Sequence, residues 1–238
     1  MPIGQNMNSR QKNLLNLIVS SYTKTAIPVG SKLIAQQANL DLSPATIRNE
    51  MAELEKEGYI FQPYTSAGRI PTEKGYQFYI DNFLATEETL PKKYQESLLG
   101  VKKVFNKYQP ELVKELAKKV VDLAQGAVFV GFSADNVYYT GLSSLFSQPE
   151  FVQHSLVCDL SRVIDHLDKT INEIFSDING VEILIGSQNP FARDCSAVLG
   201  KYEVQGQSGL FGILGPTRMD YQNNFNLVKH VKNLINNF

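Results

Sequence analysis

A short segment near the N-terminus carries side chains with the chemistry that recognises base pairs. If residues 44–57 form a helix, turning about 100° per residue, three apolar side chains share its inner face: Ile47, Met51 and Leu54. The outward and flanking positions then carry one guanidinium, one amide and small groups: Ala45, Thr46, Arg48, Asn49 and Ala52. In a major groove, arginine pairs with guanine, asparagine pairs with adenine, and methyl groups contact thymine. We interpret this face as a candidate DNA-reading surface; an ordinary solvated helix face is the alternative.

The residue types of catalysis and metal binding form no complete site in this sequence. Cys158 and Cys195 make no CxxC pair, and the local sequence supplies neither thiol with a base. His154 and Cys158 are four residues apart, a spacing that suits a metal on one helix face, but two ligands do not complete a site. Glycine motifs for phosphates and paired carboxylates are also missing. The sequence therefore predicts a protein that is not an enzyme and holds no cofactor or metal.

Two further helices would position the candidate reading helix. They are expected to begin at Ser9 and Ser31 and to bury apolar stripes: Leu14, Ile18 and Tyr22 in the first, and Leu33, Ile34 and Ala38 in the second. Residues 39–42 would form a turn before the third helix. Ser43 followed by Pro44 is a strong helix start, because the hydroxyl caps free N–H groups and proline suits the first helical position. Gly58 would end this helix.

A hairpin follows the third helix and completes the pattern of a winged helix-turn-helix domain. Residues 59–61 are typical of a strand, 65–68 of a turn, and 69–70 of a returning strand that Pro71 closes. This arrangement predicts Arg69 at the hairpin tip, free to reach a phosphate or the minor groove. The expected contacts to the DNA backbone are Lys32, Ser43 and Arg69. Winged helices that bind proteins share this layout, so an adaptor without DNA binding is an alternative function.

Periodicity divides the 238 residues into three parts with an α+β fold overall. We expect a winged-helix DNA-binding domain in residues 1–85, a helical connector in 86–125 and a domain of mixed helices and strands in 126–238. Apolar residues of the connector recur at coiled-coil spacing: Tyr94, Leu98, Val101, Phe105, Tyr108 and Leu112. They predict either a dimer seam or a stripe that packs on the chain's own rear domain, because Pro110 breaks any continuous helix.

The composition indicates a cytoplasmic globular protein. Apolar residues make up 43% and charged residues 20%, which excludes an intrinsically disordered chain. A net charge of −1 excludes a general polycation but allows a local nucleic-acid surface. Apolar runs stay well short of the roughly 18 residues that a membrane span needs. Two cysteines without a disulfide pattern suggest a reducing compartment.

Six strings of the sequence are long and distinctive: residues 28–31, 42–55 and 65–72 in the front part, and 145–151, 185–190 and 212–221 in the rear part. In composition and order these strings resemble HrcA, the family of bacterial heat-inducible transcription repressors. The resemblance implies a homodimeric repressor that binds an inverted-repeat operator upstream of chaperone genes. It also implies that the GroEL chaperonin maintains the active state of the repressor.

The same resemblance implies a GAF-like α/β fold, regulatory or dimerising, for residues 126–238. Family members are longer, because a dimerising module interrupts this domain, whereas here residues 128–132 and 137–142 follow too closely for an insert. The contacts of the homodimer must then lie elsewhere. GAF folds in other families bind ligands, so a regulator that senses an anion through Arg193 or Arg218 is a further alternative.

Overall fold

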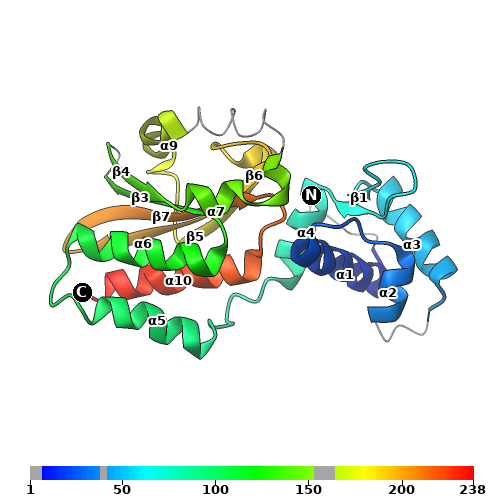
Figure 1. Cartoon of the computed structure of the whole chain (residues 1–238), viewed down its shortest axis with the longest axis horizontal. Coiled ribbons are helices and arrows are strands. Elements are labelled where there is room, and N and C mark those ends of the chain that lie inside the picture. The colour runs from blue at the N-terminus through cyan, green and yellow to red at the C-terminus, as the bar shows by residue number, and fades with distance from the viewer. Residues whose placement is uncertain (1–6, 38–41, 134, 153–163) are drawn as a thin grey trace. The chain divides into compact units, whose positions relative to one another are not determined.

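The chain consists of two units, Met1–Leu84 and Ala85–Phe238, which are described in turn. A computed structural model describes residues 7–37, 42–133, 135–152 and 164–238 (Figure 1). Helices and strands are segregated rather than alternating in parallel units, which confirms the α+β class. Residues 86–125, expected as a separate connector, contribute two helices to the second unit.

In its described residues, the first unit consists of four helices with a small hairpin. Its elements in chain order are α1 (Ser9–Thr25), α2 (Ser31–Gln37), α3 (Pro44–Lys56), β1 (Ile60–Phe61), β2 (Ile70–Pro71) and α4 (Glu73–Phe83). The strands β1 and β2 pair antiparallel, with Phe61 opposite Ile70. This order of helices and hairpin is that of a winged helix-turn-helix domain, as the sequence predicted.

Side-chain caps fix where the helices of the first unit begin. Asn8 accepts the backbone N–H of Gln11 at 2.9 Å, and the Gln11 side chain accepts the N–H of Asn8 at 3.2 Å, which forms a capping box before α1. Thr72 caps α4 by accepting the N–H of Gly75 at 3.1 Å. A side chain at position 75 would meet the Tyr59 carbonyl oxygen at 2.2 Å, so only glycine lets α4 approach the backbone before β1 this closely.

The core of the first unit is formed by the inner faces of its helices. Fully or nearly fully buried are Leu14, Leu15, Ile18, Ile34, Ile47, Met51, Leu54, Tyr59, Tyr76 and Phe78. The predicted inner face of α3 is thereby confirmed, and each large apolar side chain so buried contributes about 1.5–3 kcal/mol. Tyr22 and Leu33, expected in the core, are only half-buried.

The second unit is built on one five-stranded antiparallel sheet with strand order β4-β3-β7-β6-β5. Its strands are β3 (Ala127–Ser133), β4 (Asn136–Thr140), β5 (Val181–Ile185), β6 (Cys195–Val204) and β7 (Gln207–Pro216). The helices described for this unit are α5 (Lys92–Lys102), α6 (Pro110–Ala124), α7 (Leu142–Phe146), α9 (Leu167–Ile174) and α10 (Tyr221–Asn236), with short 3-10 turns η1 (Pro149–Val152) and η2 (Gly186–Gln188). Ser133 pairs with Asn136, so only two residues join β3 to β4.

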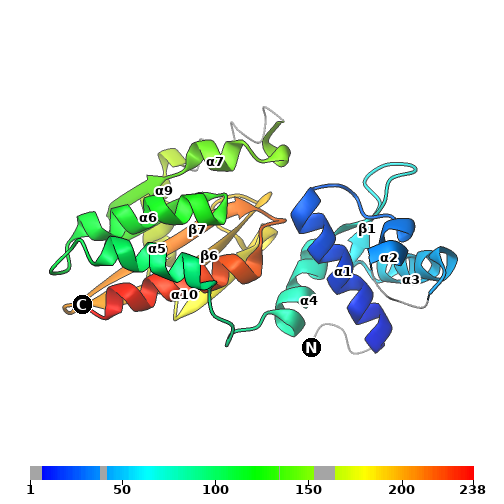
Figure 2. The same ribbon diagram turned by 60° about the horizontal axis from the view of Figure 1, so that its bottom comes forward.

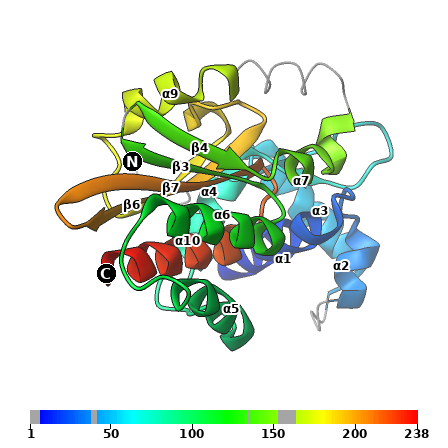
Figure 3. The same ribbon diagram turned by 60° about the vertical axis from the view of Figure 1, so that its left-hand side comes forward.

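Helices cover both faces of this sheet. In Figure 3, α9 and α7 lie on one face and α6 and α10 on the other, with α5 outermost. The core under α7 and α9 includes the rings of Phe129 and Phe191, which are tilted by 48° with centroids 4.8 Å apart, together with Ile171 and Leu199. The residues that join the two units are held within the second one, since the side-chain amide of Gln222 bonds both the N–H and the carbonyl of Ala85.

The apolar stripe of the expected connector packs inside the second unit. Figure 2 shows α5, α6 and α10 running side by side. Leu98 and Leu112 are fully buried there, and so are the next apolar positions on α6: Val113, Leu116, Ala117 and Val120. α5 ends at Lys102 and α6 begins at Pro110, so no continuous helix exists to form a long coiled coil. Leu98 and Leu112 thus pack on the chain's own rear domain, whereas Tyr94, Val101, Phe105 and Tyr108 are only half-buried, so a dimer seam along the stripe stays a prediction.

Some sequence expectations fall outside the residues that the structure describes. They concern the turn at 39–41 and Ala38 before α3, and the pair His154 and Cys158.

Candidate nucleic-acid interface

The start of α3 is fixed by the residues that the sequence singled out. Ser43 is extended, and its Oγ accepts the backbone N–H of Thr46 at 3.1 Å. Its Oγ also lies 3.0 Å from Thr46 Oγ1. Pro44 occupies the first turn, where a missing N–H costs nothing. Ser43 is exposed, so the first turn of α3 and its cap lie at the surface of the unit.

The outward face of α3 is exposed within the first unit. Ala45, Arg48, Asn49 and Ala52 are exposed, while Thr46 on the flank is half-buried. Among the described residues, Arg48 and Asn49 have no hydrogen-bond or ion-pair partner. A guanidinium and an amide with free donors, next to two alanines, can enter a groove about 12 Å wide.

The acidic residues of α3 are held by other parts of the unit. Glu50, only 7% exposed, forms an ion pair with Arg10 of α1. Glu53 accepts a hydrogen bond from the Gln11 amide at 2.7 Å. Glu55 pairs with Arg69 of the hairpin. Three carboxylates of α3 thus face protein partners, and Arg48 is left as the charged group of its first two outward turns.

Sequence reasoning did not identify the pair of Arg10 and Glu50, although a signal was present. Glu50 comes three residues after Ile47 and directly before Met51, so it falls within the buried stripe of α3. A buried carboxylate requires a hydrogen-bonding or cationic partner. The position of Glu50 in the buried stripe therefore predicts a cation on a neighbouring helix, but it does not identify Arg10.

Arg69 differs from its predicted position and freedom. The hairpin tip is the turn from Tyr64 to Ala67, closed by the Ala67 N–H to Tyr64 carbonyl bond at 3.0 Å, with Ser66 at φ 69°. Arg69 lies two residues beyond this turn, and its Nε donates to Glu55 Oε2 at 2.9 Å. The expectation of an arginine at the tip, free to extend, is therefore wrong, because α3 supplies a carboxylate that holds it.

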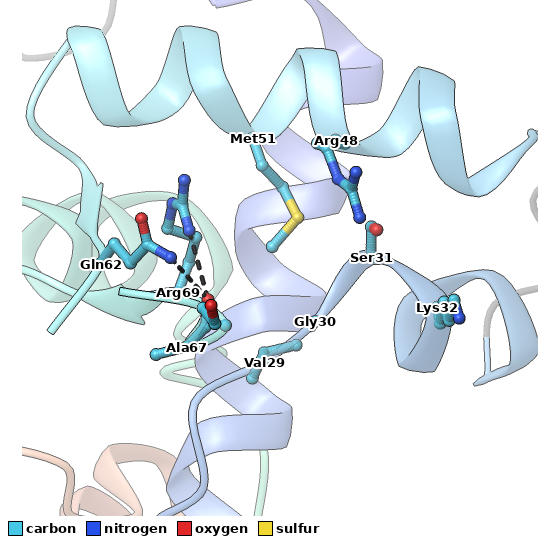
Figure 4. Close-up of a pocket in the computed structure, with 11 residues that line it drawn as sticks. Val29, Gly30, Ser31, Lys32, Arg48, Met51, Gln62, Ala67 and Arg69 are labelled. Carbon is cyan, nitrogen blue, oxygen red and sulfur yellow. Dashed lines mark hydrogen bonds between the residues drawn. The ribbon is translucent and has the colours of Figure 1, made fainter. Parts of the chain in front are cut away.

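A groove of about 550 Å³ separates α2, α3 and the hairpin. Its lining includes Lys32 from α2, Arg48 and Met51 from α3, and residues 66–69 from the hairpin. Figure 4 shows Arg48 pointing from α3 toward Ser31, with the Met51 side chain between Arg48 and Arg69. Lys32 is exposed at the start of α2. The structure thus brings Lys32, Ser31 and Arg48 around one opening, whereas Arg69 closes its far side.

The second unit offers weaker candidates for chemistry. The Arg218 guanidinium donates to Glu150 at 2.5 and 3.2 Å and to the Gln148 side chain at 2.9 Å, so this arginine is committed to a protein network. Arg193 is exposed. Burial raises the pKa of the Cys195 thiol to about 12, with smaller contributions from Asp194 and Glu150, which keeps this thiol protonated. A reactive nucleophile needs the opposite shift.

Acidic, histidine and cysteine side chains in residues 7–37, 42–133, 135–152 and 164–238 do not gather in threes around a possible metal position. Within those same ranges, every helix is too short or too polar to cross a membrane.

Comparisons with known proteins cover nearly the whole chain. The model of the HrcA protein C terminal domain matches residues 85–224, and the model of the winged helix-turn-helix transcription repressor, HrcA DNA-binding, matches residues 6–82. The heat-inducible transcription repressor HrcA of Natranaerobius thermophilus is 30% identical, with 95% of each chain aligned. That of a Thermoanaerobacter species is 26% identical, with 97% of this chain and 98% of the relative aligned.

The same comparisons bear on length and fold. The alignment with the Natranaerobius thermophilus protein has 328 positions against 238 residues here, so at least 90 positions of that relative have no counterpart in this chain. A crystal structure of a hypothetical protein is 18% identical, with a TM-score of 0.75 over 98% of both chains, and this likeness supports the fold.

Proposed function

The chain belongs to the HrcA family of heat-inducible transcription repressors, and we propose that it represses chaperone genes by binding an inverted-repeat operator through the exposed face of α3. The observation that carries this proposal is the outward pair Arg48 and Asn49, which have free donors on a helix whose own carboxylates are turned to protein partners. A protein-binding winged helix has no need of such a surface.

The proposed roles follow from side-chain chemistry and position. Arg48 and Asn49 would pair with guanine and adenine, and the methyl groups of Ala45 and Thr46 would contact thymine. Lys32, exposed beside the groove, would contact a phosphate. Ser43, exposed at the start of α3, would contact the DNA backbone through its hydroxyl.

We infer that the repressor acts as a homodimer in the cytoplasm. An inverted repeat presents two symmetric half-sites, and one winged helix contacts too few bases for tight specific binding. Leu98 and Leu112 of the stripe on α5 and α6 are buried within their own unit, so we propose that the pairing surface lies on the exposed faces of the second unit.

The partnership with the GroEL chaperonin rests on family membership alone. We propose that operator binding by freshly refolded protein rises when GroEL and its nucleotide are added. Refolded protein that is already fully active and gains nothing from the chaperonin would remove this partner from the proposal.

Binding to the organism's own chaperone promoter tests the central proposal. The measurement is a gel shift across a salt series, with a duplex of the same composition and scrambled order as control. We expect the promoter to bind at least about a thousandfold more tightly than the scrambled duplex. Equal affinity for the two duplexes would contradict a sequence-specific repressor, and no binding to either would favour the protein-binding adaptor.

A further inference from the structure

We propose that Glu55 sets the position of the wing, the hairpin of residues 60–71, and withholds Arg69 from the DNA backbone. The wing then meets DNA through uncharged groups at its tip. This inference rests on the proposed function and assigns positioning roles to two residues of the DNA-binding unit. Operator preference of the wild-type chain tests the proposed function, whereas variants at Glu55 and Arg69 test the positioning roles.

The Glu55 carboxylate holds both strands of the wing to the recognition helix α3. Its Oε1 accepts the backbone N–H of Gln62, just after β1, at 2.9 Å. Its Oε2 accepts Nε of Arg69, just before β2, at 2.9 Å. The two oxygens thus engage opposite strands of one hairpin, and hydrogen bonds to an ionised carboxylate are stronger than those between neutral groups. The side chains of Glu55 and Arg69 are only 32% and 21% exposed.

Contacts around this pair brace the wing on its other side. Arg69 exchanges two backbone hydrogen bonds with Val29, each of 2.9 Å, so the loop before α2 forms a third edge of the wing. Gly68 presses on that loop, and a side chain there would lie 2.5 Å from the Val29 carbonyl carbon. The Gln62 amide donates to the Ala67 carbonyl at 3.0 Å and closes the turn. Arg69 is therefore bonded on both sides, to α3 and to the loop before α2, and does not extend from the tip.

The charge of the wing gives this junction a consequence for DNA binding. Arg69 is the single cation of residues 60–71, and Glu55 neutralises it. The tip residues Tyr64, Thr65 and Ser66 are exposed and uncharged, with Tyr64 at 66% exposure. A ring and two hydroxyls can contact sugars and the walls of a minor groove without releasing counterions. Cationic groups elsewhere, such as Lys32 and Arg48, would then account for the salt dependence of binding.

The test compares salt dependence and operator preference in matched variants of the full chain. The variants are Glu55→Gln, Arg69→Gln and the double substitution, and the control is Glu57→Gln, which removes the same charge at an exposed position one residue past α3. Glutamine keeps an oxygen for the Gln62 N–H, so each variant retains the means to fold, and thermal unfolding of each checks that it has.

We expect Arg69→Gln to lower the preference for operator over scrambled DNA at least about fivefold and to leave the log–log salt slope unchanged. Glu55→Gln should lower the preference similarly and steepen the slope by up to about 0.9, because the freed arginine can reach a phosphate. The double variant should lose this increase, and Glu57→Gln should keep the wild-type preference.

Two other results would overturn the inference. One is a salt slope that falls by about 0.9 in Arg69→Gln while Glu55→Gln keeps full operator preference, which would make Arg69 a direct phosphate contact. The other is an unchanged preference and slope in all three variants, which would mean that the wing makes no contribution. Wild-type protein without operator preference would instead contradict the proposed function, whatever the variants do.

Discussion

Arg10 and Glu50, forty residues apart in the sequence, form an ion pair that joins α1 to the inner side of the recognition helix α3. The Glu50 side chain is 8% exposed, whereas that of Arg10 is 49% exposed, so the pair lies at the edge of the core. One residue further along α1 and three further along α3, Gln11 and Glu53 connect the same helices through a neutral donor. The back of α3 is thus fixed at two successive points, while its front stays free.

Removing Arg10 should destabilise the first unit. The Arg10→Ala variant leaves Glu50 buried without its cation, and we expect a loss of about 1–2 kcal/mol of unfolding free energy, which is less than for a fully buried pair because Arg10 is half exposed. Urea unfolding measures this loss. Lys24→Ala, an exposed substitution near the end of the same helix, is the control and should change stability by less than about 0.5 kcal/mol. Equal effects of the two substitutions would show that the ion pair contributes nothing.

Arg48 should carry sequence discrimination. Because its guanidinium is exposed on the outward face of α3, the Arg48→Ala variant should lose about 1–3 kcal/mol of binding free energy on the operator and less on scrambled DNA. Lys56→Ala removes an exposed cation in the last turn of α3 and serves as the control. A loss of the same size on both duplexes would reassign Arg48 to the phosphate backbone.

The inner face of α3 was predictable from sequence, whereas the state of Arg69 was not. Ile47, Met51 and Leu54 follow the helical period, which a single segment contains in full. The partner of Arg69 is Glu55, fourteen residues earlier on another element, and only the folded hairpin brings them together. Turn composition likewise located the hairpin but placed its tip too late in the chain, since the closing bond begins at Tyr64.

The partner that covers the apolar stripe on α5 and α6 was likewise not predictable from the sequence. Its spacing identified the apolar side chains correctly, but periodicity does not say whether a second chain or the same chain covers them. In the structure, the same chain covers Leu98 and Leu112 completely, while Tyr94, Val101, Phe105 and Tyr108 stay half-buried.

Leu98 should therefore matter for stability rather than for assembly. Leu98→Ala removes a fully buried side chain between α5 and its neighbours, and we expect a loss of about 2–5 kcal/mol of unfolding free energy. Leu99→Ala, at the adjacent position with 40% exposure, is the control and should cost less than about 1 kcal/mol. Thermal unfolding followed by circular dichroism compares the two. If Leu98→Ala instead lost the dimer while keeping full stability, Leu98 would belong to a contact between two chains.

Cys195 should resist thiol reagents in the folded protein. A pKa of about 12 leaves about one thiol in 10⁴ ionised at pH 8, and the thiolate is the reacting form. In a Cys158→Ser background, iodoacetamide should modify native protein far more slowly than urea-unfolded protein. Because the pKa is raised, increasing the pH to 9 should multiply the native rate about tenfold and still leave it low. Native and unfolded rates of similar size at pH 8 would contradict this assignment.

The homodimer should form without the stripe on α5 and α6. Light scattering at micromolar concentration should give twice the chain mass of 26.6 kDa, and titration of the operator should reach two chains per inverted repeat. The exposed side of α5 is one surface still open to pairing, since Leu99 is 40% exposed and Val104, just past the helix, is 77% exposed. A Leu99→Glu/Val104→Glu variant should stay folded because neither side chain is buried. Loss of its dimer mass would place the contact there, and retention would place it elsewhere on the second unit. A monomeric mass for the wild-type chain would restrict pairing to the operator, where the two half-sites alone bring the chains together.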